Sequence, residues 1–540
     1  MAGLAATFGS GAMTNPIKDV LKAQTILVTG TNTTENHPIF ANYVKEAVLK
    51  HGAKLIVCDP RRIDLVDFAH IYLCPKPGTD IAWINGMMHV ILTENLHDLP
   101  YIETRTTGFK EYEKCIEKYN PQYVSEITGI PEKDLCDAAR IYARAKPASI
   151  LYAMGITQHT SGTDNVKSLG NLALLCGNVG IEGGGVNPLR GQNNVQGACD
   201  LGALPNVFTG YQKVTNAETV NKFMKAWNVD SLSSEPGLTL TEMFSSAESG
   251  NVRAIYVMGE NPMISDPDLN HMDKCIDSLE FLVVQDIFLT ETAKHADVVF
   301  PAAAFAEKDG TFTNSERKVQ RIRKAVKPPS EAKEDREIIS GISRKMGYEM
   351  EYANAESIFE EIRSITPSYA GITYSRIKHE GIPWPCPSED HPGTPVLHVG
   401  QFSIGRAIFS PIDHRPPAEV PDKDYPFFLT TGRVLQHFHT GTMTRKGNGL
   451  NQLYPEVLVE INPDDALSCK ISEGDMVIVS SRRGTIKAKA QLSNRPGKGV
   501  IFIPFHFHEV AVNRLTNSAL DPIAKIPELK VCAVRIQKYL

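Results

Sequence analysis

The sequence lacks the features that mark membrane, secreted and nucleic-acid-binding proteins. No apolar run in the 540 residues approaches the roughly 20 residues that a membrane helix needs. Met1–Met13 has no charged segment before its apolar residues, unlike a signal peptide. The net charge of -6 argues against a nucleic-acid-binding protein, which is usually basic. These absences predict a cytoplasmic protein with neither a membrane span nor a nucleic-acid partner, and the length predicts several domains.

Motifs for metal clusters and for two common enzyme classes are also missing. No two of the ten cysteines form a C-x-x-C pair, so we expect free thiols and no protein ligand to a metal within this chain. G-x-S-x-G and P-loop motifs are absent, which argues against those hydrolases and NTPases. The pairs His437/His439 and His506/His508 would suit zinc if each lay on one face of a strand. Since no carboxylate-rich motif accompanies them, barrel-surface or ligand-facing histidines are favoured.

Short β-branched runs alternate with helical patterns over the first 330 residues, which is typical of parallel α/β layers. We predict two doubly wound, Rossmann-like α/β units, one over residues 1–192 and one over residues 193–330. The expected strands are Thr25–Thr29, Lys54–Cys58, Ser149–Met154, Ala254–Met258, Phe281–Val284 and Asp297–Phe300.

The pattern changes after residue 330. Residues 331–415 are predicted to contain helices, to about residue 380, and then a crossing rich in proline, since nine prolines lie between Pro383 and Pro421. Residues 416–540 have the period of two that is typical of strands, with a hairpin expected from Asp475–Ser480 and Thr485–Leu492. This last part is predicted to be a separate β-barrel.

Polar side chains follow the predicted strands where each one ends. Asn32, Glu35 and Asn36 come after the first strand, where a G-x-G-x-x-G nicotinamide motif is absent. Asp59 follows the second strand, and Gly78 and Asp80 begin a later helix. Each alone suits simple capping and turn chemistry, but together at the carboxyl ends of parallel strands they predict a nucleotide-like ligand.

A glycine-rich segment supplies the clearest candidate for substrate binding. Gly177–Gly202 contains eight glycines and a single arginine, Arg190. Such backbone can approach a ligand closely, and a guanidinium can bind a carboxylate or phosphate through two hydrogen bonds. The alternative is a flexible loop with a surface arginine, which this glycine density disfavours.

The segment VNPLRGQNNVQGACDLGALP at Val186–Pro205 resembles the catalytic subunits of formate dehydrogenases. These belong to the molybdopterin bis-guanine-dinucleotide oxidoreductases, the dimethyl-sulfoxide-reductase superfamily. The resemblance continues through essentially the whole chain, including MGEN at Met258–Asn261 and EKDGTFTNSERKVQ at Glu307–Gln320.

The resemblance implies a molybdenum or tungsten bis-(molybdopterin guanine dinucleotide) cofactor spread over the two α/β units. It assigns cofactor contacts to Asn32, Glu35, Asn36, Asp59, Arg61, Gly78, Asp80, Met154, Gln158, Gln192, Asn261, Gln285, Asp286, Arg433, His437, Asn513 and Lys530. Glu35 and Asn36 stand where a related enzyme is expected to have Asp and Ser.

The same resemblance makes Arg190 the substrate arginine and formate the substrate. Formate would be held as a carboxylate while its C–H bond is cleaved at the oxidised metal centre. Hydride transfer to a sulfido ligand and proton abstraction with electron transfer are the two competing accounts. Electrons are expected to pass through a [4Fe-4S] cluster to a flavin and iron–sulfur partner subunit, of which deazaflavin-linked subunits are one kind.

Two parts of the family's pattern are not found in this sequence, namely the cluster's cysteines and the cysteine or selenocysteine that binds the metal. We interpret the chain as an in-frame downstream piece that would not oxidise formate alone. The alternatives are a separate polypeptide that assembles with an upstream half, a non-catalytic pterin-binding or assembly protein, and another molybdopterin enzyme such as a nitrate reductase or formylmethanofuran dehydrogenase. A zinc hydrolase using the H-x-H pairs is a remote further alternative.

Overall fold

The computed structural model describes residues 1–539, and the chain divides into two compact units. The first unit comprises residues 1–191, the short segment 264–270, and the chain from Val396 onward. The second comprises residues 192–263 and 271–395. The first unit therefore combines the predicted N-terminal α/β unit with the predicted barrel.

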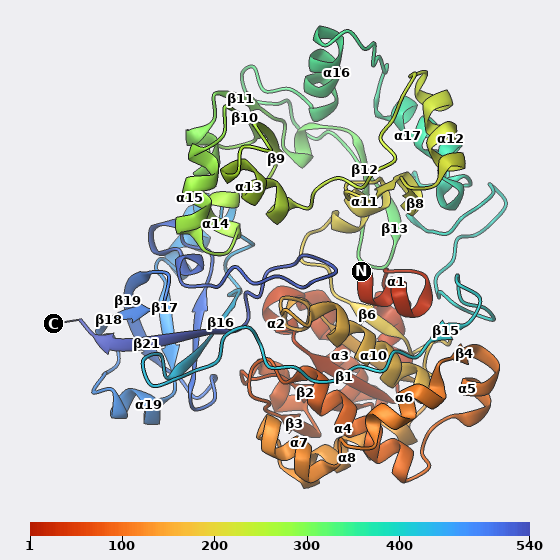
Figure 1. Ribbon diagram of the computed structural model, residues 1–540. Helices are drawn as coiled ribbons and strands as arrows, with labels where there is room; N and C mark the ends of the chain where they lie inside the picture. The colour runs from red at the N-terminus through yellow and green to blue at the C-terminus, as the bar shows by residue number, and fades with distance from the viewer. Residues whose placement is uncertain (540) are drawn as a thin grey trace. The chain divides into compact units, whose positions relative to one another are not determined.

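A five-stranded parallel sheet forms the centre of the N-terminal α/β part (Figure 1). Its order is β3-β2-β1-β5-β6, so the chain adds β2 and β3 on one side of β1 and then β5 and β6 on the other. This reversal between β1 and β5 defines a doubly wound fold, which is the fold class predicted for this part of the chain. The strands are β1 Thr25–Thr29, β2 Lys54–Cys58, β3 Ile71–Leu73, β5 Ala148–Tyr152 and β6 Val186–Pro188.

Alternate residues of this sheet enter two separate hydrophobic cores. Ile26 and Val28 pack in one core with the helix α3, Pro38–His51. Leu27 packs in the other core, with residues of α4 and α10. Because both faces are covered, the strands are apolar throughout rather than alternating. The other principal helices of this part are α4 Asp80–Thr93, α5 Leu99–Arg105, α6 Phe109–Ile116, α7 Pro121–Thr128, α8 Glu132–Arg144 and α10 Gly162–Leu175.

The C-terminal part of the first unit is a closed β-barrel, as predicted. Its strands join in the order β16-β20-β17-β19-β18-β21. The predicted hairpin is present as the antiparallel pair β18 and β19. The strands are β16 Phe427–Gly432, β17 Leu458–Ile461, β18 Met476–Ser480, β19 Thr485–Leu492, β20 Val500–Pro504 and β21 Cys532–Lys538.

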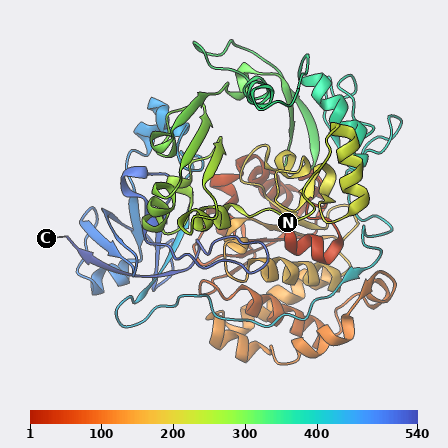
Figure 2. The same cartoon turned by 45° about the horizontal axis from the view of Figure 1, so that its top comes forward.

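The second unit contains the second parallel sheet, drawn in green in Figure 2. Its order is β11-β10-β9, from β9 Ala254–Met258, β10 Phe281–Asp286 and β11 Val298–Pro301. A small antiparallel sheet follows, made of β12 Gly310–Thr313, β13 Lys318–Ile322 and β14 Ile382–Pro383. The helices include α11 Val195–Asp200, α12 Ala217–Trp227, α13 Leu240–Glu248, α16 Asp335–Lys345 and α17 Ala355–Ile365. The helices α14 Pro262–Ser265 and α15 Leu269–Asp277 each include residues of the segment 264–270, which belongs to the first unit.

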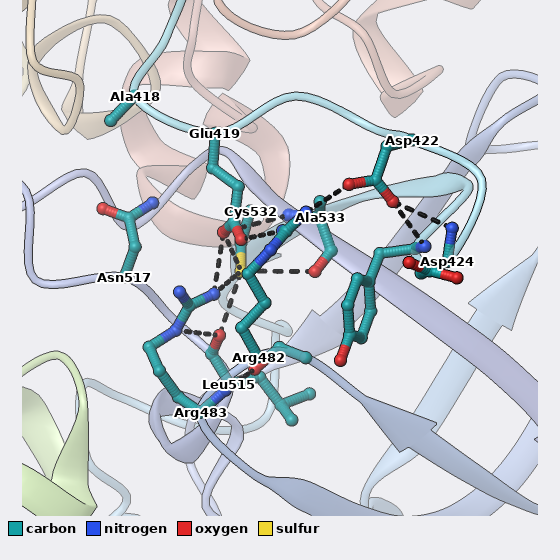
Figure 3. A network of polar contacts seen from close by, with 12 residues as sticks. Ala418, Glu419, Asp422, Asp424, Arg482, Arg483, Leu515, Asn517, Cys532 and Ala533 are labelled. Carbon is teal, nitrogen blue, oxygen red and sulfur yellow. Dashed lines mark hydrogen bonds and ion pairs between the residues drawn. The ribbon is translucent and has the colours of Figure 1, made fainter.

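The proline-rich crossing is attached to the barrel by a polar network around Glu419 (Figure 3). Glu419 accepts hydrogen bonds from Arg482 and from Arg483, the latter at 2.7 Å. The Cys532 thiol donates to the same carboxylate at 3.2 Å. The Glu419 side chain is only 10% exposed, so these partners replace the water that it would otherwise bind.

We expect Glu419→Gln to lower the free energy of unfolding by about 1.5–3 kcal/mol, because charged hydrogen bonds to two guanidinium groups weaken. Denaturant unfolding of the full chain measures the change. Asp422→Asn is the matched control, since Asp422 also binds Arg482 but is 45% exposed. That control should lower the free energy of unfolding less than Glu419→Gln does. Equal losses of unfolding free energy in the two variants would contradict the stabilising role assigned to Glu419.

Among residues 1–539, no helix is both long enough and apolar enough to cross a membrane.

Candidate functional site

Every strand of the first sheet is followed by a residue predicted to bind the cofactor or substrate. Since the five strands are parallel, their carboxyl ends lie at one edge of the sheet, where ligands of doubly wound folds bind. The structure therefore brings these residues from five separate loops to that edge. In strand order they are Asn32, Glu35 and Asn36 after β1, Asp59 and Arg61 after β2, Gly78 and Asp80 after β3, Met154 and Gln158 after β5, and Arg190 after β6.

Two glycines bring the loops after β1 and β5 together at the reversal point. Gly155 donates its backbone N–H to the carbonyl of Gly30 at 2.9 Å. A Cβ atom on Gly30 would lie 2.6 Å from the backbone nitrogen of Ile156, and Gly30 has a φ of +57°. A larger residue at Gly30 would therefore clash and be strained. This contact fixes the starts of the loops that carry Asn32 and Met154.

The loop after β1 contains buried polar atoms that lack hydrogen-bond partners in the described chain. They are both amide atoms of Asn32, Oγ1 of Thr34, Oε2 of Glu35 and Oδ1 of Asn36. Leaving such atoms unpaired costs about 1–3 kcal/mol each. Their concentration in one loop at the ligand-binding edge indicates a polar ligand that supplies both donors and acceptors.

Ionisable groups at the same edge have shifted pKa values. Desolvation raises the pKa of Asp59 to about 6 and also raises that of Asp80. Desolvation, together with the positive charge of Arg433, lowers the pKa of Lys530 to about 7. Lys530 donates from Nζ to the carbonyl of Thr431 at 2.6 Å. Clustered shifts of this kind are typical of binding sites.

Arg433 is the centre of an electropositive part of the first unit. It follows β16, and its Nη1 donates to the carbonyl of Gly191, the residue after Arg190, at 3.1 Å. Desolvation and the charge of Arg433 lower the pKa values of His37 and His439 to about 4, so both are neutral near pH 7. A bound anion would be attracted by Arg433 and stabilised there.

Arg190 lies at the carboxyl end of β6 and is positioned by the backbone near the N-terminus. Its Nη2 donates to the carbonyl of Gly11 at 3.0 Å. Its charge lies near enough to Tyr152, the last residue of β5, to act on the pKa of that phenol. The Gly11 carbonyl therefore holds one side of the Arg190 guanidinium in place, at the carboxyl ends of the strands.

Several predicted ligands already have strong partners within the first unit. Arg61 forms a buried pair with Glu460, with Nε to Oε2 at 2.9 Å and Nη2 to Oε1 at 2.6 Å. Glu35 accepts from Arg495 at 2.6 Å. Asn513 donates to the carbonyl of Ile264 at 2.9 Å, but its buried Oδ1 has no partner in the described chain. Sequence reasoning missed Glu460 and Arg495, which no motif marks.

The H-x-H pairs do not have the strand geometry considered for zinc. His437 and His439 lie after β16 in a segment that is not a strand, and His439, in a turn, has a φ of +49°. His506 and His508 follow the end of β20. His437 Nε2 lies 2.8 Å from the carbonyl oxygen of Tyr454. Over residues 1–539 these histidines belong to no group of three potential metal ligands, which removes the basis of the zinc hydrolase alternative.

Three of the four predicted ligands of the second unit, Asn261, Gln285 and Asp286, lie at the carboxyl ends of its sheet. Asn261 follows β9 and accepts from the Thr292 hydroxyl at 2.7 Å. Gln285, in β10, donates to Asp335 at 2.6 Å. Asp286 ends β10, and desolvation raises its pKa. Gln192 is the first residue of this unit.

We expect the first unit to lose stability as the pH falls from 6.5 toward 3, partly because His506 must be neutral. Its Nε2 accepts from the Val434 N–H at 3.0 Å, and its Nδ1 contacts the carbonyl of His439. Desolvation lowers the pKa of His506 to about 3, with further lowering by Arg433, His437 and His439. The unfolded state binds this proton first, so each pH unit in that window removes about 1.4 kcal/mol.

Melting temperature against pH measures this effect. His506→Gln should flatten the slope between pH 6 and pH 4, although it lowers stability at pH 7. His51→Gln, at an exposed position of α3, is the control and should leave the slope unchanged. An unchanged slope in His506→Gln would contradict the prediction.

Comparison with known proteins agrees with this geometry. The family model Molybdopterin oxidoreductase matches residues 3–345, and the model Molydopterin dinucleotide binding domain matches residues 427–533. The F420-dependent formate dehydrogenase subunit alpha of Methanocaldococcus jannaschii is 55% identical over 100% of this chain and 80% of its own length. Formate dehydrogenase H of Escherichia coli is 42% identical over 99% of this chain and 76% of its own length.

Among solved structures, acetylene hydratase from Pelobacter acetylenicus has a TM-score of 0.79 at 20% identity. The match covers 100% of this chain and 80% of that one, and it supports the fold. The chain belongs to the molybdopterin oxidoreductase family. Within that family, both sequence relatives named above are formate dehydrogenases.

The residues present fit a molybdopterin guanine dinucleotide. The unpartnered amide atoms of Asn32 match the hydrogen-bonding edges of a base or pterin. The charge of Arg433 suits a pyrophosphate, and so does Lys530, because a bound anion would raise its pKa above about 7 and favour the charged amine. Asn32, Arg433 and Lys530 all belong to the first unit, so this comparison rests on the burial and hydrogen bonding within that unit.

Proposed function

We propose that the chain belongs to the catalytic subunit of a formate dehydrogenase, which oxidises formate to carbon dioxide at a molybdenum or tungsten bis-(molybdopterin guanine dinucleotide) centre. The observation that carries the proposal is Arg190, a lone guanidinium held at the ligand-binding edge of a chain whose relatives are formate dehydrogenases. Each formate ion that is oxidised yields one carbon dioxide, one proton and two electrons.

The proposed cofactor ligands divide by their place in the chain. In the first unit they are Asn32, Glu35, Asn36, Asp59, Gly78, Asp80, Met154, Gln158, Arg433, His437, Asn513 and Lys530. In the second they are Gln192, Asn261, Gln285 and Asp286. Arg61 is better assigned to positioning, because Glu460 binds its guanidinium and its backbone N–H donates to Asp59 at 3.0 Å.

The bound metal centre supplies a two-electron oxidant. Arg190 binds the carboxylate through two parallel N–H···O hydrogen bonds, which orients the C–H bond away from the guanidinium. The charge of Arg433 adds to the attraction of the site for anions. Because carbon dioxide is neutral, the same guanidinium binds the product more weakly than the substrate, which favours product release.

We further propose that the enzyme is cytoplasmic and passes electrons through a [4Fe-4S] cluster to a partner subunit with flavin and iron–sulfur centres. Deazaflavin-linked subunits are one class of partner. The relatives whose names describe them as alpha subunits support an assembly of more than one chain.

The holoenzyme should reduce an artificial viologen dye when formate is added under anaerobic conditions. Nitrate, offered with reduced viologen, should not be consumed at a comparable rate. Nitrate consumption without formate oxidation would favour a nitrate reductase. Cofactor and metal at full occupancy with neither reaction would favour a pterin-binding or assembly protein.

A further inference from the structure

Three side chains that commonly bind transition metals meet in the second unit, and none of them is assigned to the cofactor. Glu248 is the last residue of α13. His271 and Cys275 lie in α15, four residues apart, which places them on one face of that helix. All three belong to the same compact unit.

The thiol and one imidazole nitrogen already lie at the separation of a metal site, whereas the exposed carboxylate contacts the other ring nitrogen and must turn to reach the same cation. The Cys275 Sγ lies 3.5 Å from His271 Nε2, and the Glu248 Oε2 lies 3.5 Å from His271 Nδ1. One ligand atom from each residue lies within 4.8 Å of the others. In tetrahedral zinc sites, bonds of about 2.3 Å to sulfur and about 2.0–2.1 Å to nitrogen separate those two atoms by about 3.5 Å. The sulfur and the nitrogen are already at this separation.

Burial and ligand type indicate which cation would bind. Cys275 is fully buried and His271 is partly buried, whereas the Glu248 side chain is 47% exposed. A cation can therefore enter past the exposed carboxylate, and water can complete the coordination. A thiolate with an imidazole selects zinc and similar borderline cations over magnesium or calcium, which prefer oxygen ligands. We propose that Glu248, His271 and Cys275 bind one zinc-class divalent cation.

A cation at this site would join two helices that precede neighbouring strands of the second sheet. The helix α13 ends shortly before β9, and α15 ends shortly before β10. Since β9 and β10 are paired, the cation would fix both helices beside the same part of the sheet. Cation binding should therefore stabilise the second unit, because a ligand that binds only the folded state raises its melting temperature.

Cobalt(II) titration of the metal-depleted full chain tests the proposal. One equivalent should give a thiolate-to-cobalt charge-transfer band in the near ultraviolet and d–d bands typical of a tetrahedral site in the visible. Cys275→Ala should abolish the charge-transfer band, and His271→Gln should weaken cobalt binding at least tenfold. The controls Cys386→Ala and His295→Gln change a buried cysteine and an exposed histidine of the same unit and should leave the spectrum unchanged.

A second measurement does not depend on a variant at a buried position. Zinc should raise the melting temperature of the unaltered chain, and the increase should be smaller in His271→Gln. The absence of a charge-transfer band in the unaltered chain would overturn the proposal. So would a band that persists in Cys275→Ala, or a zinc-dependent increase that is equal in His271→Gln.

Discussion

Replacing Arg190 with lysine should raise the KM for formate about 10- to 100-fold in the holoenzyme. Lysine keeps the positive charge but cannot make two parallel hydrogen bonds to a carboxylate. Losing one charge-assisted hydrogen bond costs about 1.4–3 kcal/mol, which corresponds to that range. Initial rates of dye reduction over a formate titration measure the change. Metal and pterin content should stay the same, since Arg190 is assigned to the substrate.

The control for this variant is Arg62→Lys, because Arg62 is a 46% exposed arginine that pairs with Asp67 on the surface. It should leave the KM within about twofold of the unaltered value. An unchanged KM in Arg190→Lys would contradict the substrate role of Arg190. Loss of the cofactor from that variant would instead assign Arg190 to the pterin.

Removing Glu460 should cause the largest loss of stability of any single substitution considered. The Arg61 and Glu460 side chains are 5% and 7% exposed and form two hydrogen bonds. The Arg61 guanidinium also lies 4.0 Å from the centre of the Phe502 ring. Glu460→Ala leaves that charge buried without its partner, which costs about 3–5 kcal/mol. Denaturant unfolding measures the loss.

Two comparisons separate the buried pair from an ordinary ion pair. The double variant Arg61→Met with Glu460→Met should be less destabilised than Glu460→Ala, because no unpaired charge remains. Glu280→Ala removes an exposed partner of Arg253 and should cause a much smaller loss than Glu460→Ala. A loss below about 1 kcal/mol in Glu460→Ala would contradict the assigned importance of the buried pair.

The sequence predicted those parts of the site that depend on local pattern. Polar residues such as Asn32, Asp59 and Asp80 follow recognisable strand and helix signals, and parallel strands place their carboxyl ends at one edge. The two α/β sheets and the barrel hairpin followed from hydrophobic period and turn chemistry. The short strand β3 was missed, because its three residues are too few to show a period.

Contacts between distant residues could not be predicted in this way. Glu460 is 399 positions from Arg61, and no local pattern connects the two. Asp200 is a second case, because it is buried and accepts from the Trp384 indole at 2.6 Å and the Tyr369 hydroxyl at 2.6 Å. The H-x-H pairs suit zinc only on a strand, whereas His437 and His439 lie outside any strand and His439 has a φ of +49°. The surroundings of each of these side chains depend on how distant parts of the chain pack together, which residue type alone does not predict.

Oxidation of ¹³C-labelled formate by the purified holoenzyme tests the central claim most directly. With excess viologen under anaerobic conditions, the account predicts one ¹³C-labelled carbon dioxide and two reduced viologens for each formate consumed. Failure of a fully cofactor-loaded enzyme to form labelled carbon dioxide would contradict the account.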